Sequence, residues 1–151
     1  MVDAYTKRER VALLTRLREQ LLAQREKFEE YLVVLEQQED AISEGDAERL
    51  AQYVEMETRI IGDIEATQRV VAPLAAVYRE VTAEPDPEIV DLTDTLGRLH
   101  KEASSRNQRN QELLRGGIET LRQEIAAVRK PQQPHNVYSS RGTATVLDIS
   151  T

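Results

Sequence analysis

The chain has 151 residues, of which 31% are charged and only 4% aromatic, and it contains no cysteine. The absence of cysteine excludes disulfides, thiol nucleophiles and thiolate metal sites. A net charge of −7 at pH 7 argues against duplex DNA or an anionic membrane as the main partner, because both repel an acidic protein. The many Leu, Ala, Glu, Arg and Gln residues are typical of long helices and predict an all-α fold.

Neither a signal peptide nor a membrane span is expected. The first ten residues, MVDAYTKRER, lack the apolar core of a signal peptide. The longest apolar run covers residues 70–78, and it is much shorter than the about 20 residues that a membrane-spanning helix needs. We therefore expect a cytoplasmic protein without membrane insertion.

The first predicted helix covers residues 4–42. Large apolar residues recur in it every seven positions, and a second row, offset from the first, is half polar. This is the heptad spacing of a coiled coil, and no Gly or Pro interrupts it before the end of the helix. The first row is Leu14, Leu21, Phe28, Leu35 and Ile42, and the second is Leu17, Gln24, Tyr31 and Gln38.

The second predicted helix covers residues 47–82. Gly45 suits a left-handed stop for the first helix, and Asp46 suits the N-cap of the second. Pro73 lies inside the apolar stripe of this helix. Because proline lacks a backbone donor and clashes with the preceding turn, we expect a kink between Arg69 and Pro73 rather than an end of the helix.

The third predicted helix covers residues 87–129, with Asp86 as its N-cap and Pro87 in its first position. Its apolar stripe slips by four residues between 110 and 118, which indicates a stutter in the coiled coil. The glycine pair 116–117 lies in the same place. The pair lowers the stability of the helix by about 2 kcal/mol relative to two alanines. A close helix–helix approach or a hinge would explain why glycines stand here.

Two tight connections between three long helices predict an elongated, antiparallel three-helix bundle of the coiled-coil type, forming one domain of residues 1–130. A seam of three helices leaves part of the third helix uncovered, beyond the reach of the second. After Lys130 the composition changes to Pro, Ser and Thr without helical periodicity. We expect residues 131–151 to form a flexible C-terminal tail.

Nothing in the sequence indicates catalysis, a cofactor or a metal site. His100 and His135 are the only histidines, and neither follows a Glu at the spacing that di-iron helical bundles use. The motifs HExxH, GxGxxG, P-loop and nucleophile elbow are all missing. Arginines of the third helix alternate with Glu and Asp, which weakens a nucleic-acid interpretation. We therefore expect a protein that is not an enzyme and binds no nucleic acid.

Asn107 and Asn110 interrupt the apolar stripe of the third helix. Asparagine is a poor helix former, so another role should favour it here. A buried polar pair that fixes the register of the coiled coil is one interpretation. A polar landmark at which a foreign segment docks is the other, and both stay open.

Three sequence motifs occur in a characteristic order. They are AISEGDAERL at residues 41–50, Asn-x-x-Asn-x-x-Leu at residues 107–113, and Tyr-x-x-x-Gly at residues 138–142. This order, behind a long amphipathic first helix, resembles the FlgN-type flagellar export chaperones over about residues 10–142.

The resemblance implies a cytoplasmic chaperone of the flagellar type III secretion system. Such a chaperone binds the C-terminal helical segments of the hook–filament junction proteins FlgK and FlgL, prevents their premature self-association and delivers them to the export gate. The resemblance also implies that Tyr138 contacts the cytoplasmic domain of the gate protein FlhA, and that no nucleotide or metal takes part.

The apolar stripe of the third helix complements the apolar face of a client helix, in the helix-in-groove mode. A structural coiled-coil adaptor without chaperone activity is the alternative, and self-association through the third helix or the tail stays open. The candidate client-binding residues are Asn107, Asn110, Leu113, Leu114, Ile118, Leu121, Ile125 and Val128.

Overall fold

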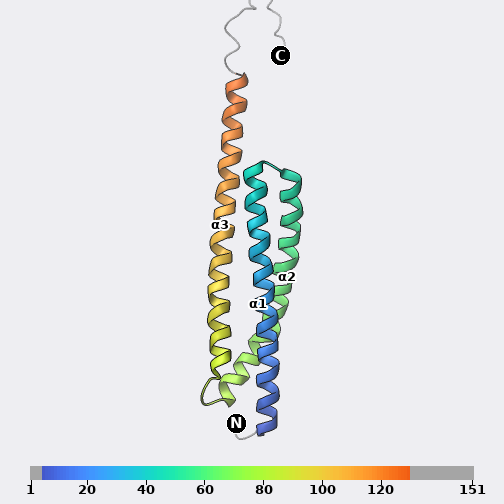
Figure 1. Ribbon diagram of the computed structural model, residues 1–151, viewed down its shortest axis with the longest axis vertical. Coiled ribbons are helices and arrows are strands. Elements are labelled where there is room, and N and C mark those ends of the chain that lie inside the picture. Colours follow the sequence, from blue (N-terminus) through green and yellow to red (C-terminus); the bar gives the residue numbers. More distant parts are fainter. Residues whose placement is uncertain (1–4, 130–151) are drawn as a thin grey trace, which may run out of the picture. The chain divides into compact units, whose positions relative to one another are not determined.

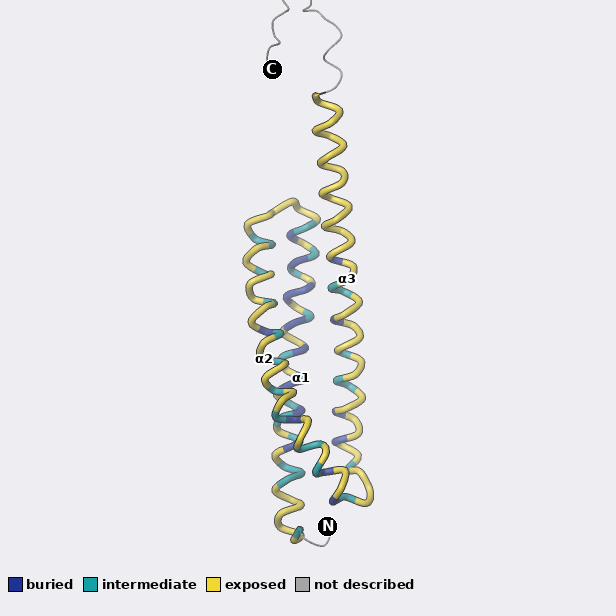
Figure 2. The backbone as a smooth tube through the Cα atoms, turned by 180° about the vertical axis from the view of Figure 1, so that it is seen from behind, coloured by how far each residue is buried: buried dark blue, intermediate teal, exposed yellow. Residues whose placement is uncertain are grey.

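The structure, a computed structural model, describes residues 5–129. These residues form three helices, α1 (Lys7–Glu44), α2 (Ala47–Val81) and α3 (Pro87–Arg129), and contain no strand. The chain divides into two units, a bundle unit of residues 1–111 and a C-terminal unit of residues 112–151. In the bundle unit α1, α2 and the first part of α3 run up, down and up side by side (Figures 1 and 2). The predicted all-α three-helix bundle is confirmed.

Capping contacts fix where α1 begins and ends. Thr6 and Glu9 form a capping box, in which the Thr6 hydroxyl accepts from the Glu9 amide at 3.1 Å and the Glu9 carboxylate accepts from the Thr6 amide at 2.6 Å. α1 therefore begins at Lys7, later than the periodicity alone indicated. Gly45 ends it with φ of 69°, in the left-handed region that favours glycine.

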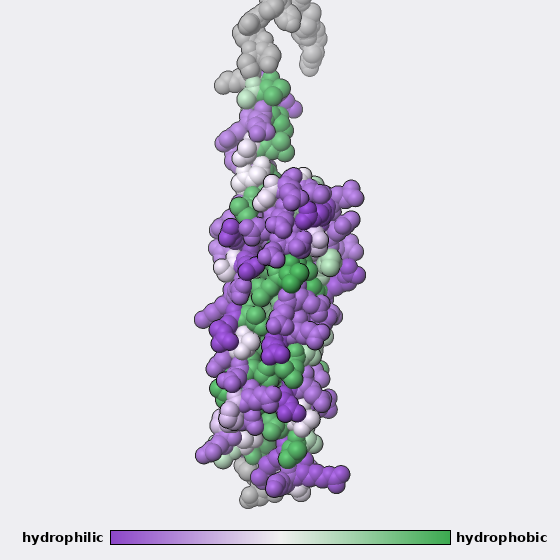
Figure 3. Space-filling model, in the orientation of Figure 1, coloured by the Kyte–Doolittle hydropathy of each residue, from purple (hydrophilic) through white to green (hydrophobic). Residues whose placement is uncertain are grey.

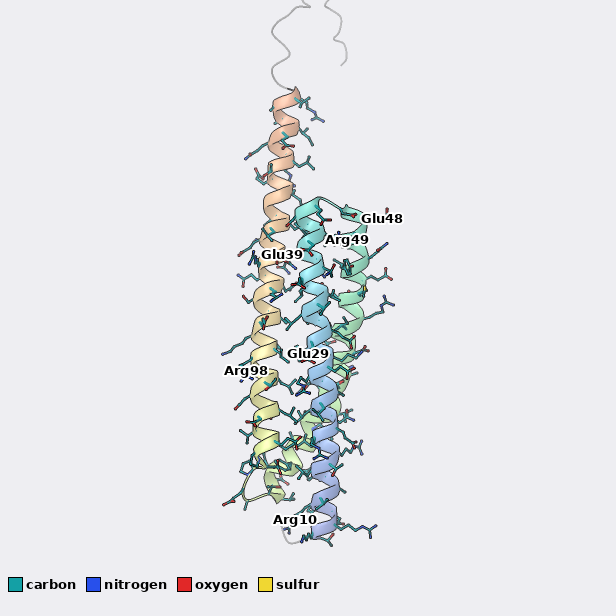
Figure 4. The ribbon with its side chains drawn as sticks, viewed as in Figure 1. Arg10, Glu29, Glu39, Glu48, Arg49 and Arg98 are labelled. Carbon is teal, nitrogen blue, oxygen red and sulfur yellow. The ribbon has the colours of Figure 1, made fainter. Side chains whose placement is uncertain are left out.

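The side chain of Asp46 caps α2 by accepting from the Arg49 amide at 3.0 Å. The Arg49 guanidinium also pairs with Glu44 at 2.6 Å across the α1–α2 turn, and Figure 4 labels Arg49 there. The pKa of Arg49 is raised, chiefly by this hydrogen bond to Glu44. α2 then continues through Pro73 and changes direction over its C-terminal third, which contains that residue (Figures 1 and 2).

Two hydrophobic clusters form the core of the bundle unit, and each takes residues from all three helices. α1 contributes most of the buried positions, which begin at Leu17 and are drawn in dark blue in Figure 2. The first cluster contains Leu17, Leu21, Val71, Tyr78, Ile89 and Leu92. The second contains Phe28, Tyr31, Val34, Leu35, Ile60 and Ala103.

Polar side chains inside the bundle are paired between α1 and α2. The Gln24 amide donates to Gln68 at 2.9 Å, and both Tyr31 and Gln38 donate to the carboxylate of Glu57 at 2.9 Å. Burial and the charge of Glu57 raise the pKa of Tyr31, which keeps the phenol protonated as a donor. The half-polar row of the first helix is therefore a set of satisfied contacts that fixes the register of α1 on α2.

Candidate client-binding surface

The last part of α3, residues 112–129, carries a concentration of exposed apolar side chains. Every residue from Gln111 to Arg129 is exposed. Six large hydrophobic residues of this segment are between 39% and 70% exposed, and the rest of the described chain holds only five others in this state. We call the six the α3 stripe: Leu113, Leu114, Ile118, Leu121, Ile125 and Val128.

Helical spacing gathers five of the six members of the α3 stripe on one face, while Leu113 lies about 100° around the helix from Leu114 and borders that face. From Leu114 to Val128 its members follow one another by alternating steps of four and three residues, which place them in line along the helix. At 1.5 Å per residue that line is about 21 Å long. Figure 3 shows hydrophobic residues in a column along this segment, with hydrophilic ones beside them.

The same face of α3 is covered in the bundle unit. Ile89 and Leu92 lie in the first hydrophobic cluster and Ala103 in the second, while Leu96 packs against both. These residues are spaced three or four positions apart, and the α3 stripe has the same spacing further along the helix. The positions of α3 in the two clusters are thus buried or half-buried in the bundle unit, and its large apolar residues from Leu113 onward are exposed.

Asn110 is engaged inside the bundle. Its side chain is 4% exposed, and its Nδ2 donates to the backbone carbonyl of Leu35 on α1 at 2.9 Å. One residue earlier, Arg109 pairs with Glu39 of α1 at 3.1 Å. Asn107 is half-buried. The contact of Asn110 supports the register interpretation, since it uses the amide within the molecule.

The two glycines of α3 have open surroundings. The helix is unbroken through Gly116 and Gly117, and a Cβ placed on either would meet no atom within 4 Å. A close helix–helix approach therefore does not explain them within the described residues, and the hinge stays a prediction.

Other predicted positions lie elsewhere. Tyr138, His135 and the whole of the tail, residues 131–151, fall outside the described residues. His100 packs its ring edge-on to Phe28 at 6.0 Å between centroids.

No cluster of three or more His, Cys, Asp or Glu suited to a metal ion occurs within residues 5–129. None of the helices in that range is long and apolar enough to cross a membrane.

One feature of the bundle was not predicted from the sequence. A cavity of about 680 Å³ opens where α2 connects to α3, among Leu17, Val71, Tyr78 and Ile89. Its walls come from all three helices and from the connection between α2 and α3, a combination that the periodicity of each separate helix does not encode.

Comparison with known proteins identifies the family of the chain. The model of the family described as FlgN protein matches residues 13–145. The chain belongs to the FlgN family. An uncharacterized protein of Treponema pallidum (strain Nichols) is 36% identical over 141 residues, which are 93% of this chain and 91% of that protein. No solved structure matches the chain. The predicted family is confirmed, and membership of the FlgN family indicates a general role as a flagellar export chaperone.

Proposed function

We propose that this chain is a cytoplasmic chaperone that binds the C-terminal helical segments of hook–filament junction proteins of the FlgK and FlgL kind. It prevents their premature self-association and delivers them to the flagellar export gate. The observation that carries the proposal is the α3 stripe, a line of exposed apolar side chains on a formed helix. A contiguous line of exposed large apolar side chains supports the proposal, because such patches are typical of interaction sites.

The α3 stripe is suited to a client helix because it belongs to a helix that the bundle already nucleates. An isolated helix of 18 residues is only marginally stable in water, since the first turn is costly to form. α3 is continuous from Pro87 to Arg129, so residues 112–129 need no separate nucleation. A preformed helix reduces the ordering cost that binding must offset.

The six partly exposed side chains of the α3 stripe would form a small interface of moderate affinity. Full burial of one such side chain contributes about 1.5–3 kcal/mol, and association costs several kcal/mol of lost freedom. We expect a net affinity near micromolar, about −8 kcal/mol. Such an affinity suits a chaperone, which must release its client at the export gate.

The central test places a charge in the middle of the α3 stripe. We expect Leu121→Asp to lower the affinity for a C-terminal client segment at least about a hundredfold, because a carboxylate would be buried against apolar side chains. Isothermal titration calorimetry with the full chain measures it. Gln123→Asp is the matched control, since it adds the same charge to an exposed position on the opposite face. Equal loss in both variants, or no client binding by the wild type, would remove the proposal.

The adaptor alternative makes a different prediction. An adaptor would be a permanent oligomer with the α3 stripe already buried, visible as a constant higher mass by light scattering. A monomer that associates only when the client is added would exclude it.

Delivery to the export gate is proposed to depend on Tyr138. We expect Tyr138→Ala to leave the calorimetric affinity for the client unchanged and to reduce secretion of the client in cells. Loss of client binding in this variant would instead assign the tail to the client site.

A further inference from the structure

A row of arginines borders the α3 stripe on one side only. Arg115, Arg122 and Arg129 directly follow Leu114, Leu121 and Val128, so they recur every seven residues and lie in line along the helix. All three are exposed. The row therefore runs beside the apolar line over its whole length.

The opposite border of the α3 stripe carries less charge. It is formed by Gly117, Thr120 and Glu124, which precede the stripe residues Ile118, Leu121 and Ile125. This side carries one carboxylate and no basic residue. The α3 stripe thus has a cationic edge and a nearly uncharged edge.

The arginines of the cationic edge have no ion-pair partner among residues 5–129. Three basic residues of the bundle unit that are next in sequence to a buried residue do have one, and it lies on a neighbouring helix. These bundle pairs are Arg18 with Glu88 at 3.4 Å, Lys27 with Asp63 at 3.4 Å and Arg109 with Glu39 at 3.1 Å. Glu39 is labelled on α1 in Figure 4.

At three places in the bundle, a basic residue beside the apolar seam faces a carboxylate on a neighbouring helix. The C-terminal part of α3 repeats the seam and the basic residues without the carboxylates. We propose, building on the chaperone function, that the α3 stripe takes a client helix whose apolar face is bordered by a row of Asp or Glu on the edge that meets Arg115, Arg122 and Arg129.

A second copy of α3 fits this requirement poorly. In an antiparallel pair the two cationic edges would face each other, and like charges at such positions destabilise a coiled coil. In a parallel pair the cationic edge would face Gly117, Thr120 and Glu124, which offer a single carboxylate. A nucleic acid would supply negative charge but leave the apolar line in water. An acidic-edged amphipathic helix satisfies both features at once.

Two synthetic helical peptides test the proposal. They share one Leu/Ile stripe and differ only at the bordering positions, which are Glu in one peptide and Lys in the other. We expect the Glu peptide to bind the full-length chain about tenfold more tightly, from three exposed ion pairs. The preference should shrink as salt is raised, because the pairs are exposed to solvent.

Charge reversal completes the test. The variant R115E/R122E/R129E should reverse the preference between the two peptides, while R8E/R16E/K101E should keep it, since it makes the same change of net charge at exposed positions of the bundle unit. Circular dichroism checks that both variants remain helical.

The outcomes separate this inference from the proposed function. Equal binding of both peptides by the wild type and by R115E/R122E/R129E would overturn the cationic edge while leaving the α3 stripe as a client site. No binding of either peptide or of a client segment would overturn both. Dimerisation of the wild type that the Glu peptide does not compete away would assign the surface to a second copy. Binding of a single-stranded oligonucleotide that R115E/R122E/R129E loses would assign it to nucleic acid.

Discussion

The two parts of α3 carry the same apolar pattern and differ in what covers it. From Ile89 to Asn110 the apolar face is buried or half-buried against α1 and α2, and from Leu113 to Val128 it is exposed. The sequence continues the stripe across this boundary almost without a break. Hydrophobic spacing therefore tells where a helix needs a neighbour, and only the structure tells whether the chain itself supplies one.

The two parts of α3 also differ in their polar contacts to other helices. Before the boundary, basic and amide side chains contact the neighbouring helix, as Arg109 contacts Glu39 and Asn110 contacts the Leu35 carbonyl. After it, Arg115, Arg122 and Arg129 make no such contact among the described residues. The apolar line after the boundary therefore has no polar partner from another helix among residues 5–129.

The largest effect is expected from one substitution made in both parts of α3. Leu92→Ala removes a side chain that is 5% exposed in the first cluster, and it should lower the free energy of unfolding by about 2–5 kcal/mol. Leu121→Ala removes one that is 56% exposed, and it should change that free energy by less than about 0.5 kcal/mol. Chemical denaturation followed by circular dichroism measures both. Similar losses in the two variants would contradict the contrast between covered and uncovered parts.

A smaller effect is expected at the boundary itself. Asn110→Leu removes the hydrogen bond to the Leu35 carbonyl and should change the free energy of unfolding by about 1 kcal/mol, with some loss of a unique register. Client affinity should stay within about twofold of the wild type, since the Asn110 amide already serves the bundle. Calorimetry and denaturation of the same sample separate the two effects. A large fall in client affinity with an intact bundle would move the client site across the boundary to Asn110.

Much of the fold could be predicted from the sequence because local signals agree with one another. Heptad spacing, the Gly45–Asp46 break and the Asp86–Pro87 start each mark the helices without reference to the rest of the chain. The start of α1 was less predictable, since it depends on a reciprocal contact between Thr6 and Glu9. The bundle cavity was missed because it is a property of three helices together.

The candidate surface could be predicted only in part. The spacing identified the α3 stripe, but it gave equal weight to Asn110, whose burial depends on how far α1 extends beside α3. The arginine row was visible in the sequence, yet its lack of partners required the ion pairs of the bundle for comparison. Pairing between helices is a tertiary fact that the periodicity of one helix does not contain.

The smallest effect is expected from the glycine pair. Its two alanine variants show which side of the α3 stripe a client helix contacts. Gly116→Ala and Gly117→Ala should each stabilise α3 by up to about 1 kcal/mol, because neither new Cβ meets an atom within 4 Å. Gly117 borders the α3 stripe whereas Gly116 lies on the far side. If a client helix packs closely over Gly117, its alanine variant should bind the client a few-fold less tightly despite its greater helicity, while Gly116→Ala binds as well as the wild type or better. Equal affinity in both variants would mean that the client lies nearer the arginine edge and leaves the glycine edge open.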